Sequence, residues 1–417
     1  MSAAEPSTDY AYPIRISEAF GVELEYMIVD HETLDVRPVA DRLFRAAAGH
    51  DTSSFEPDGP DGVLSWSNEL ALHIVEIKST RPVRTLDGLD AMFQSQVAEI
   101  NALLGPMGCR LMPTGMHPWM DPDREMRLWP HENTEIYQAY DRIFGCKGHG
   151  WANLQSTHIN LPFGNDEEFG RLHAAIRLVL PLIPALAASS PAIEGRMSEL
   201  ADHRLEVYRN NSKRVPLMAG MVIPEPVFTK REYDREIMGR LYAQLEPLDP
   251  AGVLRHEFAN ARGCIARFDR GAIEIRVIDI QECPSADIAV VRLVSAAVRA
   301  LAEERWSSSA SQREAGTEPL HAALIETIRA AEGATIRDAC LLSAFGADTP
   351  VRAGDLWCRL AEELCPGDPA VSELVRAGTL STRIRRAAGQ SPDRRRLHAV
   401  YAELTDCLAR GETFRAT

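Results

Sequence analysis

Short segments in the first two thirds of the chain alternate apolar and polar residues, a pattern typical of strands with one covered face. Such segments lie at about 20–29, 72–79, 109–114, 155–161 and 263–280, the last long enough for a strand pair. Over about 86–105, apolar residues recur at helical spacing instead. Because residues three and four apart share one side of a helix, we predict a helix there.

Helical spacing also marks 38–48 and 167–188, and it dominates from about 286 to the end. Strands dispersed early and helices collected late predict an α+β fold, with a mostly antiparallel sheet, packed helices and a helical C-terminal part. The polar segment 203–228 is expected to form long loops. We divide the chain into a flexible leader over 1–14, a sheet region over 15–285 that carries the candidate chemistry, and a helical region over 286–417 packed on the same domain.

The composition is ordinary for a globular protein with a large core: 417 residues, 45% hydrophobic and 25% charged. A net charge of −15 argues against a nucleic-acid or anionic-membrane partner, because such partners favour a basic surface. No secretion signal opens the chain, and its longest apolar stretch, 176–188, is interrupted by Arg177 and two prolines. The eight cysteines form no CxxC pair. We therefore expect a cytoplasmic protein with reduced thiols and no membrane partner.

Two carboxylates share one face of the first predicted strand. Side chains alternate along Gly21-Val22-Glu23-Leu24-Glu25-Tyr26, so Glu23 and Glu25 face one way and the apolar residues face the other. Taken alone, this pair is explained equally well by a solvated amphipathic strand and by a metal site.

Similar polar stripes recur on later strands, and this recurrence favours the metal site. Each stripe lies against an apolar back, as in a sheet with helices on one side and an active site on the other. The residues concerned are Glu76, the pair His158 and Asn160, and the pair Glu274 and Arg276.

Glutamates beside a histidine and an asparagine suit Mg²⁺, a hard cation that prefers carboxylate and phosphate oxygens. Neighbouring arginines would bind phosphate oxygens and offset the charge that develops during phosphoryl transfer. The sequence contains no HExxH zinc motif, no P-loop and no GxGxxG turn. A nucleotide triphosphate would therefore be held on the sheet itself.

In order and spacing, the segments FGVELEY, HIVEIKSTRP, STHINLPFG and GAIEIRVIDIQ resemble the type 2 glutamate–cysteine ligase family of carboxylate–amine ligases. The resemblance covers roughly 15–285. It implies a glutamine-synthetase-like fold, in which the concave face of a curved, largely antiparallel sheet holds ATP, metal ions and the acyl donor.

The resemblance also implies roles for single residues. Arg276 would face the transferred phosphoryl group, and it is a candidate catalytic residue together with Glu76. The implied ligands of Mg²⁺, or of Mn²⁺ as an alternative, are Glu23, Glu25, Glu76, His158 and Glu274. The implied contacts to ATP are His158, Asn160, Arg262, Arg267 and Arg214.

Further positions have two interpretations each. The basic run that contains Arg204 and Arg214 is either a phosphate-facing loop or a solvated one, and Arg262 and Arg267 could reach a substrate carboxylate instead of phosphate. His117 and Trp119 either line an amine pocket or pack within their loop. The cluster 383–386 is either a helix surface or a segment near the nucleotide.

Members of the family activate a carboxylate, commonly the γ-carboxylate of glutamate, as an acyl phosphate that an amine then attacks. The resemblance therefore implies an ATP-dependent ligase that joins an amino-acid carboxylate donor to an amine acceptor, with a homo-oligomeric state left open. The alternatives are a phosphotransferase of the guanidino-kinase type and a non-catalytic nucleotide- or metabolite-binding relative.

Overall fold

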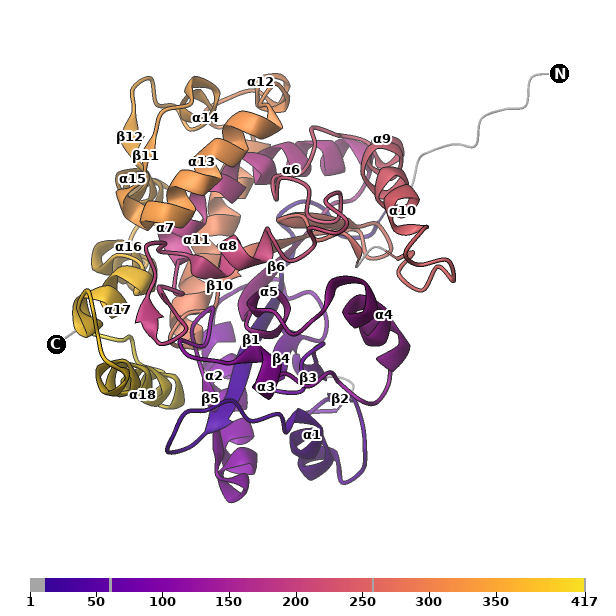
Figure 1. Ribbon diagram of the computed structural model, residues 1–417. Coiled ribbons are helices and arrows are strands. Elements are labelled where there is room, and N and C mark those ends of the chain that lie inside the picture. The colour runs from indigo at the N-terminus through magenta and orange to yellow at the C-terminus, as the bar shows by residue number, and fades with distance from the viewer. Residues whose placement is uncertain (1–11, 60–61, 257–258, 416–417) are drawn as a thin grey trace.

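The strand β1, Gly21–Asp30, pairs with three other strands and organises the sheet. The computed structural model describes residues 12–59, 62–256 and 259–415. Within these ranges eight strands form one antiparallel sheet in the order β2-β3-β4-β1-β6-β10-β9, with β5 also paired to β1 (Figure 1). The other strands are β2 (Ser54–Phe55), β3 (Leu64–Asn68), β4 (Ile74–Ser79), β5 (Cys109–Met112), β6 (Ser156–Pro162), β9 (Cys264–Arg267) and β10 (Ala272–Asp279).

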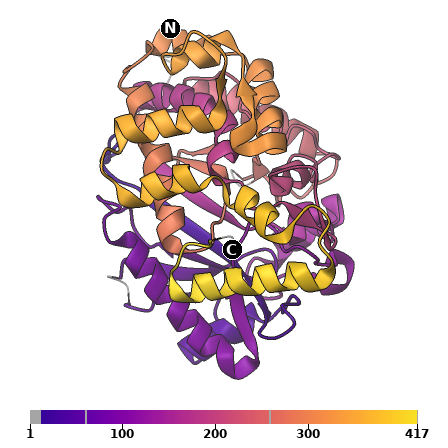
Figure 2. The same cartoon turned by 90° about the vertical axis from the view of Figure 1, so that its left-hand side faces the viewer.

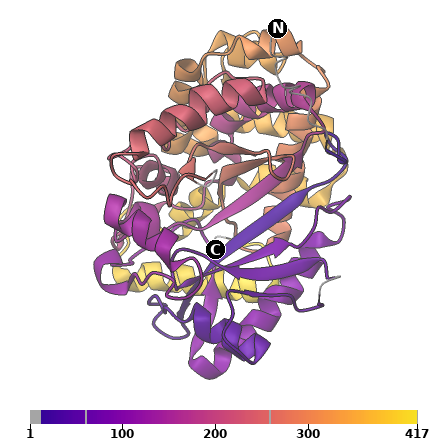
Figure 3. The ribbon, with the colours of Figure 1, turned by 90° about the vertical axis from the view of Figure 1, so that its right-hand side faces the viewer.

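The strand register brings the polar stripes side by side. Glu25 of β1 lies opposite Glu76 of β4, and Glu23 lies opposite His158 of β6. On the other side of β6, Asn160 lies opposite Glu274 of β10. Because side chains alternate along each strand, these residues share one face of the sheet. In Figure 3 the strands lie in front of the C-terminal helices.

Helices cover the opposite face. The helix α11 (Pro284–Ala302) packs against α2 (Leu89–Leu104) and α6 (Asp166–Val179), and it also contacts β6. Sheet residues that point toward these helices are fully buried, among them Val22, Leu24, Ile159, Ile273 and Ile275. Removing this apolar surface from water is the main force that holds helices and sheet together.

Helices of the C-terminal part stack across one side of the molecule (Figure 2). They share one continuous hydrophobic core with the sheet and its covering helices. They are α12 (Ser309–Arg313), α13 (Thr317–Ala330), α14 (Ala339–Ala344), α15 (Ala353–Leu364), α16 (Pro369–Ala377), α17 (Leu380–Ala388) and α18 (Arg394–Arg410), with the short strands β11 (Thr335–Ile336) and β12 (Val351–Arg352).

The basic cluster 383–386 lies in α17. Arg383 is buried, forms an ion pair with Glu282, and donates to the Phe414 carbonyl at 2.8 Å. Arg385 donates to the carbonyls of Ser198 and Leu200 at 2.8 and 2.6 Å. These two arginines therefore join the C-terminal helices to the rest of the fold.

Several elements differ from the sequence-based expectation. The strands β2 and β3 and the helix α4 (Thr134–Phe144) lie in segments where no element was predicted. The helix expected over 167–188 is divided by Pro181 and Pro184, which lack the N–H that a helix interior needs, into α6, a 3₁₀ turn and α7 (Pro184–Ala187). The segment 203–228 begins with a helix, α8 (His203–Tyr208), whose N-cap Asp202 accepts from the Leu205 backbone N–H.

The remaining α-helices and β-strands are short. They are α1 (Ala40–Ala48), α3 (Pro122–Glu125), α5 (His149–Ala152), β7 (Ala192–Ile193), β8 (Arg196–Met197), α9 (Lys230–Tyr233) and α10 (Arg240–Leu245). None of the helices in the described ranges has the length and apolar character that a membrane span requires. Of the predicted leader 1–14, residues 1–11 lie outside the described residues, and the backbone N–H of Tyr12 donates to the Gly164 carbonyl at 2.8 Å.

Asp287, in the first turn of α11, carries a carboxyl that burial makes hard to ionise. Its Oδ1 accepts from the Thr157 hydroxyl at 2.8 Å and from the Gln281 backbone N–H at 2.9 Å. Burial nevertheless raises the pKa of Asp287 to about 8. The folded protein therefore keeps a proton that the unfolded chain releases above about pH 4, and this contribution to stability falls as the pH rises from about 4 to about 8.

Replacing Asp287 by asparagine should flatten that pH dependence. Relative to Asp287→Asn, we expect the wild type to lose free energy of unfolding in urea as the pH rises from about 5 to about 8. The variant keeps an oxygen that can accept both hydrogen bonds. An equal slope in the two proteins would contradict a protonated Asp287.

Candidate active site

A row of carboxylates crosses the polar face of the sheet, and His158 lies within it. Glu23 accepts a hydrogen bond from Asn160 at 2.9 Å, and its Oε2 lies 3.0 Å from His158 Nδ1. Glu25 accepts from the backbone N–H and the hydroxyl of Ser156 at 2.7 and 2.8 Å, and that hydroxyl lies 2.9 Å from His158 Nε2. These contacts fix the imidazole of His158, which stands on β6, against the glutamates of β1.

This part of the face favours positive charge. Burial alone would lower the pKa of His158, but the hydrogen bond to Glu23 and the charges of Glu25 and Glu23 raise it to about 9. Burial opposes ionisation of Glu23, yet the contact with His158 holds the pKa of Glu23 well below its usual range. A cation at this position is therefore stabilised by the surrounding carboxylates.

Glu76 of β4 lies beside the two glutamates of β1. It accepts from the Ser67 hydroxyl at 2.5 Å and forms an ion pair with Lys78. Ligand atoms of Glu23, Glu76 and His158 lie within 4.8 Å of one another, and so do those of Glu25, Glu69 and Glu76. Glu76 is thus common to two groups, each close enough to hold one ion.

The donor set fits Mg²⁺ or Mn²⁺. Burial, only partly offset by Lys78, raises the pKa of Glu76 to about 7, and burial together with Glu76 and Glu25 raises that of Glu69 well above its usual range. Carboxylates that repel one another in this way are relieved by a divalent ion. Carboxylate oxygens with one imidazole nitrogen suit hard cations better than zinc, whose usual sites contain more histidine or cysteine.

Glu69 was not identified from the sequence. It directly follows β3, Leu64–Asn68, whose alternation of Leu64 and Trp66 with serines extends over only five residues and was not recognised as a strand. Ser67 of β3 pairs with Glu76 of β4, and this pairing brings the end of β3 close to the glutamates of β4 and β1. A search for glutamates three to eight residues before the predicted strands would have found Glu69 and one other residue, Glu257.

Two arginines flank Glu274 at the β9–β10 side of the row. Nε of Arg276 lies 3.1 Å from Glu274 Oε1, and Nη1 of Arg267 lies 3.3 Å from Glu274 Oε2. Oε1 of Glu274 also lies 3.9 Å from Nδ1 of His158. The structure therefore brings together the predicted residues of all four strand motifs, and we name Glu23, Glu25, Glu69, Glu76 and Glu274 the carboxylate row.

Two cavities open beside the row. The arginine chamber, of about 520 Å³, contains Glu25, Glu69 and His158, and its other walls include Arg204, Arg267, Arg276, Tyr137, Tyr140 and Trp151. The proline chamber, of about 570 Å³, contains Glu23, Ser67 and Asn160, and its other walls include Tyr12, Pro13, Ile14, Phe20, Pro82 and Pro162. Lys78 and Arg270 line both chambers.

Other predicted residues lie elsewhere. Arg262 is buried in a two-pronged ion pair with Glu225, at 2.6 Å for both contacts, and Arg214 donates to the Ile143 carbonyl at 2.9 Å. Neither arginine lines either chamber. Nε2 of His117 donates to the Leu34 carbonyl at 2.7 Å, and the guanidinium of Arg394 lies over the Trp119 ring, 3.9 Å from its centre. These four residues have structural contacts that account for them.

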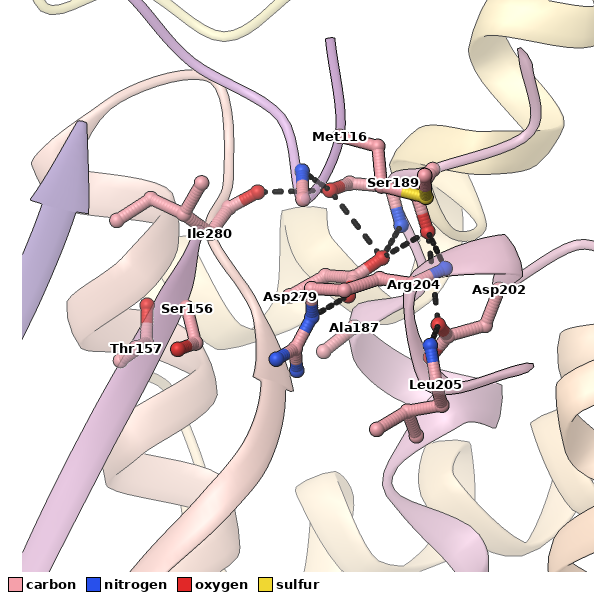
Figure 4. A network of polar contacts seen from close by, with 12 residues as sticks. Met116, Ser156, Thr157, Ala187, Ser189, Asp202, Arg204, Leu205, Asp279 and Ile280 are labelled. Carbon is pink, nitrogen blue, oxygen red and sulfur yellow. Dashed lines mark hydrogen bonds and ion pairs between the residues drawn. The ribbon is translucent and has the colours of Figure 1, made fainter. Parts of the chain in front are cut away.

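Arg204 enters the arginine chamber from a buried polar network (Figure 4). Its guanidinium pairs with Asp279, the last residue of β10, and both side chains are almost fully buried. Oδ2 of Asp279 also accepts from the Ser189 backbone N–H at 2.8 Å and from the Ser190 hydroxyl at 2.7 Å. The network joins the strand that carries Arg276 to α8.

Comparisons with known proteins agree with this architecture. The model of glutamate-cysteine ligase family 2 matches residues 19–400. An uncharacterized protein of Archaeoglobus fulgidus is 37% identical over 284 residues, which is 68% of this chain and 75% of that protein. The "Putative glutamate--cysteine ligase 2-1" of a Nocardioides species is 27% identical over 69% of each chain.

Among solved structures, the glutamate–cysteine ligase of Francisella tularensis in complex with AMP has a TM-score of 0.59 at 12% identity, covering 96% of this chain and 90% of that chain. This likeness confirms the predicted α+β fold with its mostly antiparallel sheet. Since the family match spans most of the chain, the resemblance drawn from the four strand motifs is confirmed, and the protein belongs to glutamate–cysteine ligase family 2.

Proposed function

We propose that the protein is an ATP- and Mg²⁺-dependent carboxylate–amine ligase that forms an amide, with glutamate as the acyl donor, through an acyl phosphate. The observation that supports this most is the meeting of two chambers at one carboxylate row. Two anionic substrates can approach one another only where cations separate their charges, and the row can bind such cations. The AMP bound to the Francisella tularensis ligase supports a nucleotide as one substrate.

The proline chamber suits the nucleotide. Tyr12, Phe20 and Pro82 offer flat or apolar surface for a base, and Asn160 and Lys78 lie at the side of the chamber that meets the row. The arginine chamber suits the acyl donor, since Arg267 and Arg276 can pair with carboxylates. Bound metal ions would be held by Glu23, Glu76 and His158 and by Glu25, Glu69 and Glu76, and would screen the phosphate oxygens.

The reaction then needs no protein nucleophile. A carboxylate oxygen of the donor attacks the γ-phosphorus, and the bond from that phosphorus to the bridging oxygen of ADP breaks. Lys78 and Arg276 offset the negative charge on the transferred group. The amine nitrogen next attacks the acyl carbon, inorganic phosphate leaves with the electron pair of the C–O bond, and the nitrogen loses a proton.

The expected activity can be measured directly. With ATP, Mg²⁺, glutamate and a panel of amines, we expect one ADP and one phosphate for each amide formed, with the amide identified by mass spectrometry. Other amino acids should be tested in place of glutamate in parallel assays, because the ligase activity and the identity of the acyl donor are separate parts of the proposal.

Three outcomes would count against parts of this proposal. A stable phosphorylated product without any amide would indicate a phosphotransferase. Amide formation only with another acid would overturn glutamate as donor and keep the ligase. Absence of ADP-dependent condensation with every acid–amine pair would overturn the ligase itself.

A further inference from the structure

A third cavity, of about 450 Å³, lies on the helix-covered side of the sheet. Leu161 of β6 lines it and follows Asn160 in the strand, so it points away from the carboxylate row. The other walls come from α6, α11 and the segments 16–20, 84–86 and 364–368. Apolar side chains dominate the interior, among them Leu86, Leu161, Leu172, Val298 and Leu364.

Three arginines line this apolar cavity. Arg292 forms ion pairs with Asp87 at 2.9 Å and Asp368 at 3.1 Å. Arg84 and Arg299, both exposed, have no ion pair or side-chain hydrogen bond within 12–59, 62–256 and 259–415. With three cations against two carboxylates, the cavity carries positive charge that the described residues leave unbalanced.

One buried hydroxyl in the wall also lacks a partner. Ser295 of α11 is 6% exposed and lines the cavity, and its Oγ has no hydrogen-bond partner among the described residues. A buried hydroxyl without a partner costs free energy, so an acceptor or donor atom placed in the cavity would be stabilised there.

We propose that this cavity binds an organic anion with an apolar body, its carboxylate or phosphate head contacting Arg84, Arg299 and Ser295. The body of the ligand lies against Leu161, Leu172 and Val298. The volume is within the range usual for small-ligand sites, and an apolar interior with few polar groups is typical of them. The site is on the opposite side of the sheet from the carboxylate row and shares only Phe20 with the proline chamber, so its ligand is distinct from the substrates of the proposed ligase.

The fluorescent anion 8-anilinonaphthalene-1-sulfonate, which has an apolar body, is a direct probe. We expect saturable binding to the wild type. In the double variant Arg84→Ala/Arg299→Ala the dissociation constant should be higher by about tenfold or more. The matched control is Arg337→Ala/Arg352→Ala, which removes two exposed arginines near the β11–β12 pair and should leave binding unchanged. Ala296→Phe, which places a ring in the cavity from α11, should abolish binding.

Competition with unlabelled ligands shows whether the dye binds in this cavity or in the proline chamber, and which head group the cavity prefers. Saturating ATP with Mg²⁺ should not displace the dye, whereas octanoate should displace it if the site prefers a carboxylate, and octyl phosphate if it prefers a phosphate. Displacement by ATP, equal binding in both double variants, or displacement by neither amphiphile would each overturn the proposal.

Discussion

Replacing Glu76 by glutamine is expected to lower the rate of ATP-dependent amide formation by about 10³-fold, because it removes charge from both candidate ion sites at once. Glu76 is the one member common to the two groups whose ligand atoms lie within 4.8 Å of each other. Glutamine keeps the shape of the side chain and can still accept the Ser67 hydrogen bond. The loss should therefore appear in turnover and in metal binding, with the fold retained.

The effect of Mg²⁺ on the melting temperature, with a matched control variant, distinguishes this effect from misfolding. Mg²⁺ should raise the melting temperature of the wild type and should raise that of Glu76→Gln much less, since a ligand stabilises only the state that binds it. Glu99→Gln, an exposed substitution on α2, is the matched control and should behave as wild type. Full activity in Glu76→Gln would show that the carboxylate row is not the metal site.

Replacing Asp279 by alanine should have the largest effect on stability, a loss of about 3–5 kcal/mol in the free energy of unfolding. The substitution leaves the guanidinium of Arg204 buried without its charge partner, and it also removes the acceptor for Ser189 and Ser190. A buried charge that loses its partner retains its full cost of desolvation.

Urea unfolding checks this value against a matched surface pair. Glu326→Ala breaks an ion pair with Arg329 of 2.7 Å between side chains that are 42% and 62% exposed, and it should cost only about 0.2–1 kcal/mol. If Asp279→Ala is no less stable than Glu326→Ala, the network at the end of β10 does not hold that strand to α8.

Alternation along single strands was sufficient to predict most of the carboxylate row. Glu23 and Glu25, His158 and Asn160, and Glu274 and Arg276 each reveal a shared face within two residues of sequence. The order of the strands in the sheet is not encoded at that range. The closeness of Glu25 to Glu76 depends on an antiparallel register between β1 and β4, which the sequence pattern alone leaves open.

Contacts distant in sequence determine where Glu69, Arg262 and Arg214 lie. Glu69 reaches the row because β3 pairs with β4. Arg262 and Arg214 carry the charge expected of a phosphate contact, but Glu225 and the Ile143 carbonyl hold them in the surrounding framework. A charged side chain in sequence gives no indication of which partner it will find after folding.

The side chains that line the arginine chamber come partly from the sheet and partly from elements outside it. The carboxylates stand on strands whose register also fixes the hydrophobic core, so a change of register would turn them away from the site. Tyr137, Tyr140 and Trp151 stand on α4 and α5, outside the sheet. Under the proposed function, changes in the segment 133–154 can therefore alter substrate range while the carboxylates on the strands stay in place.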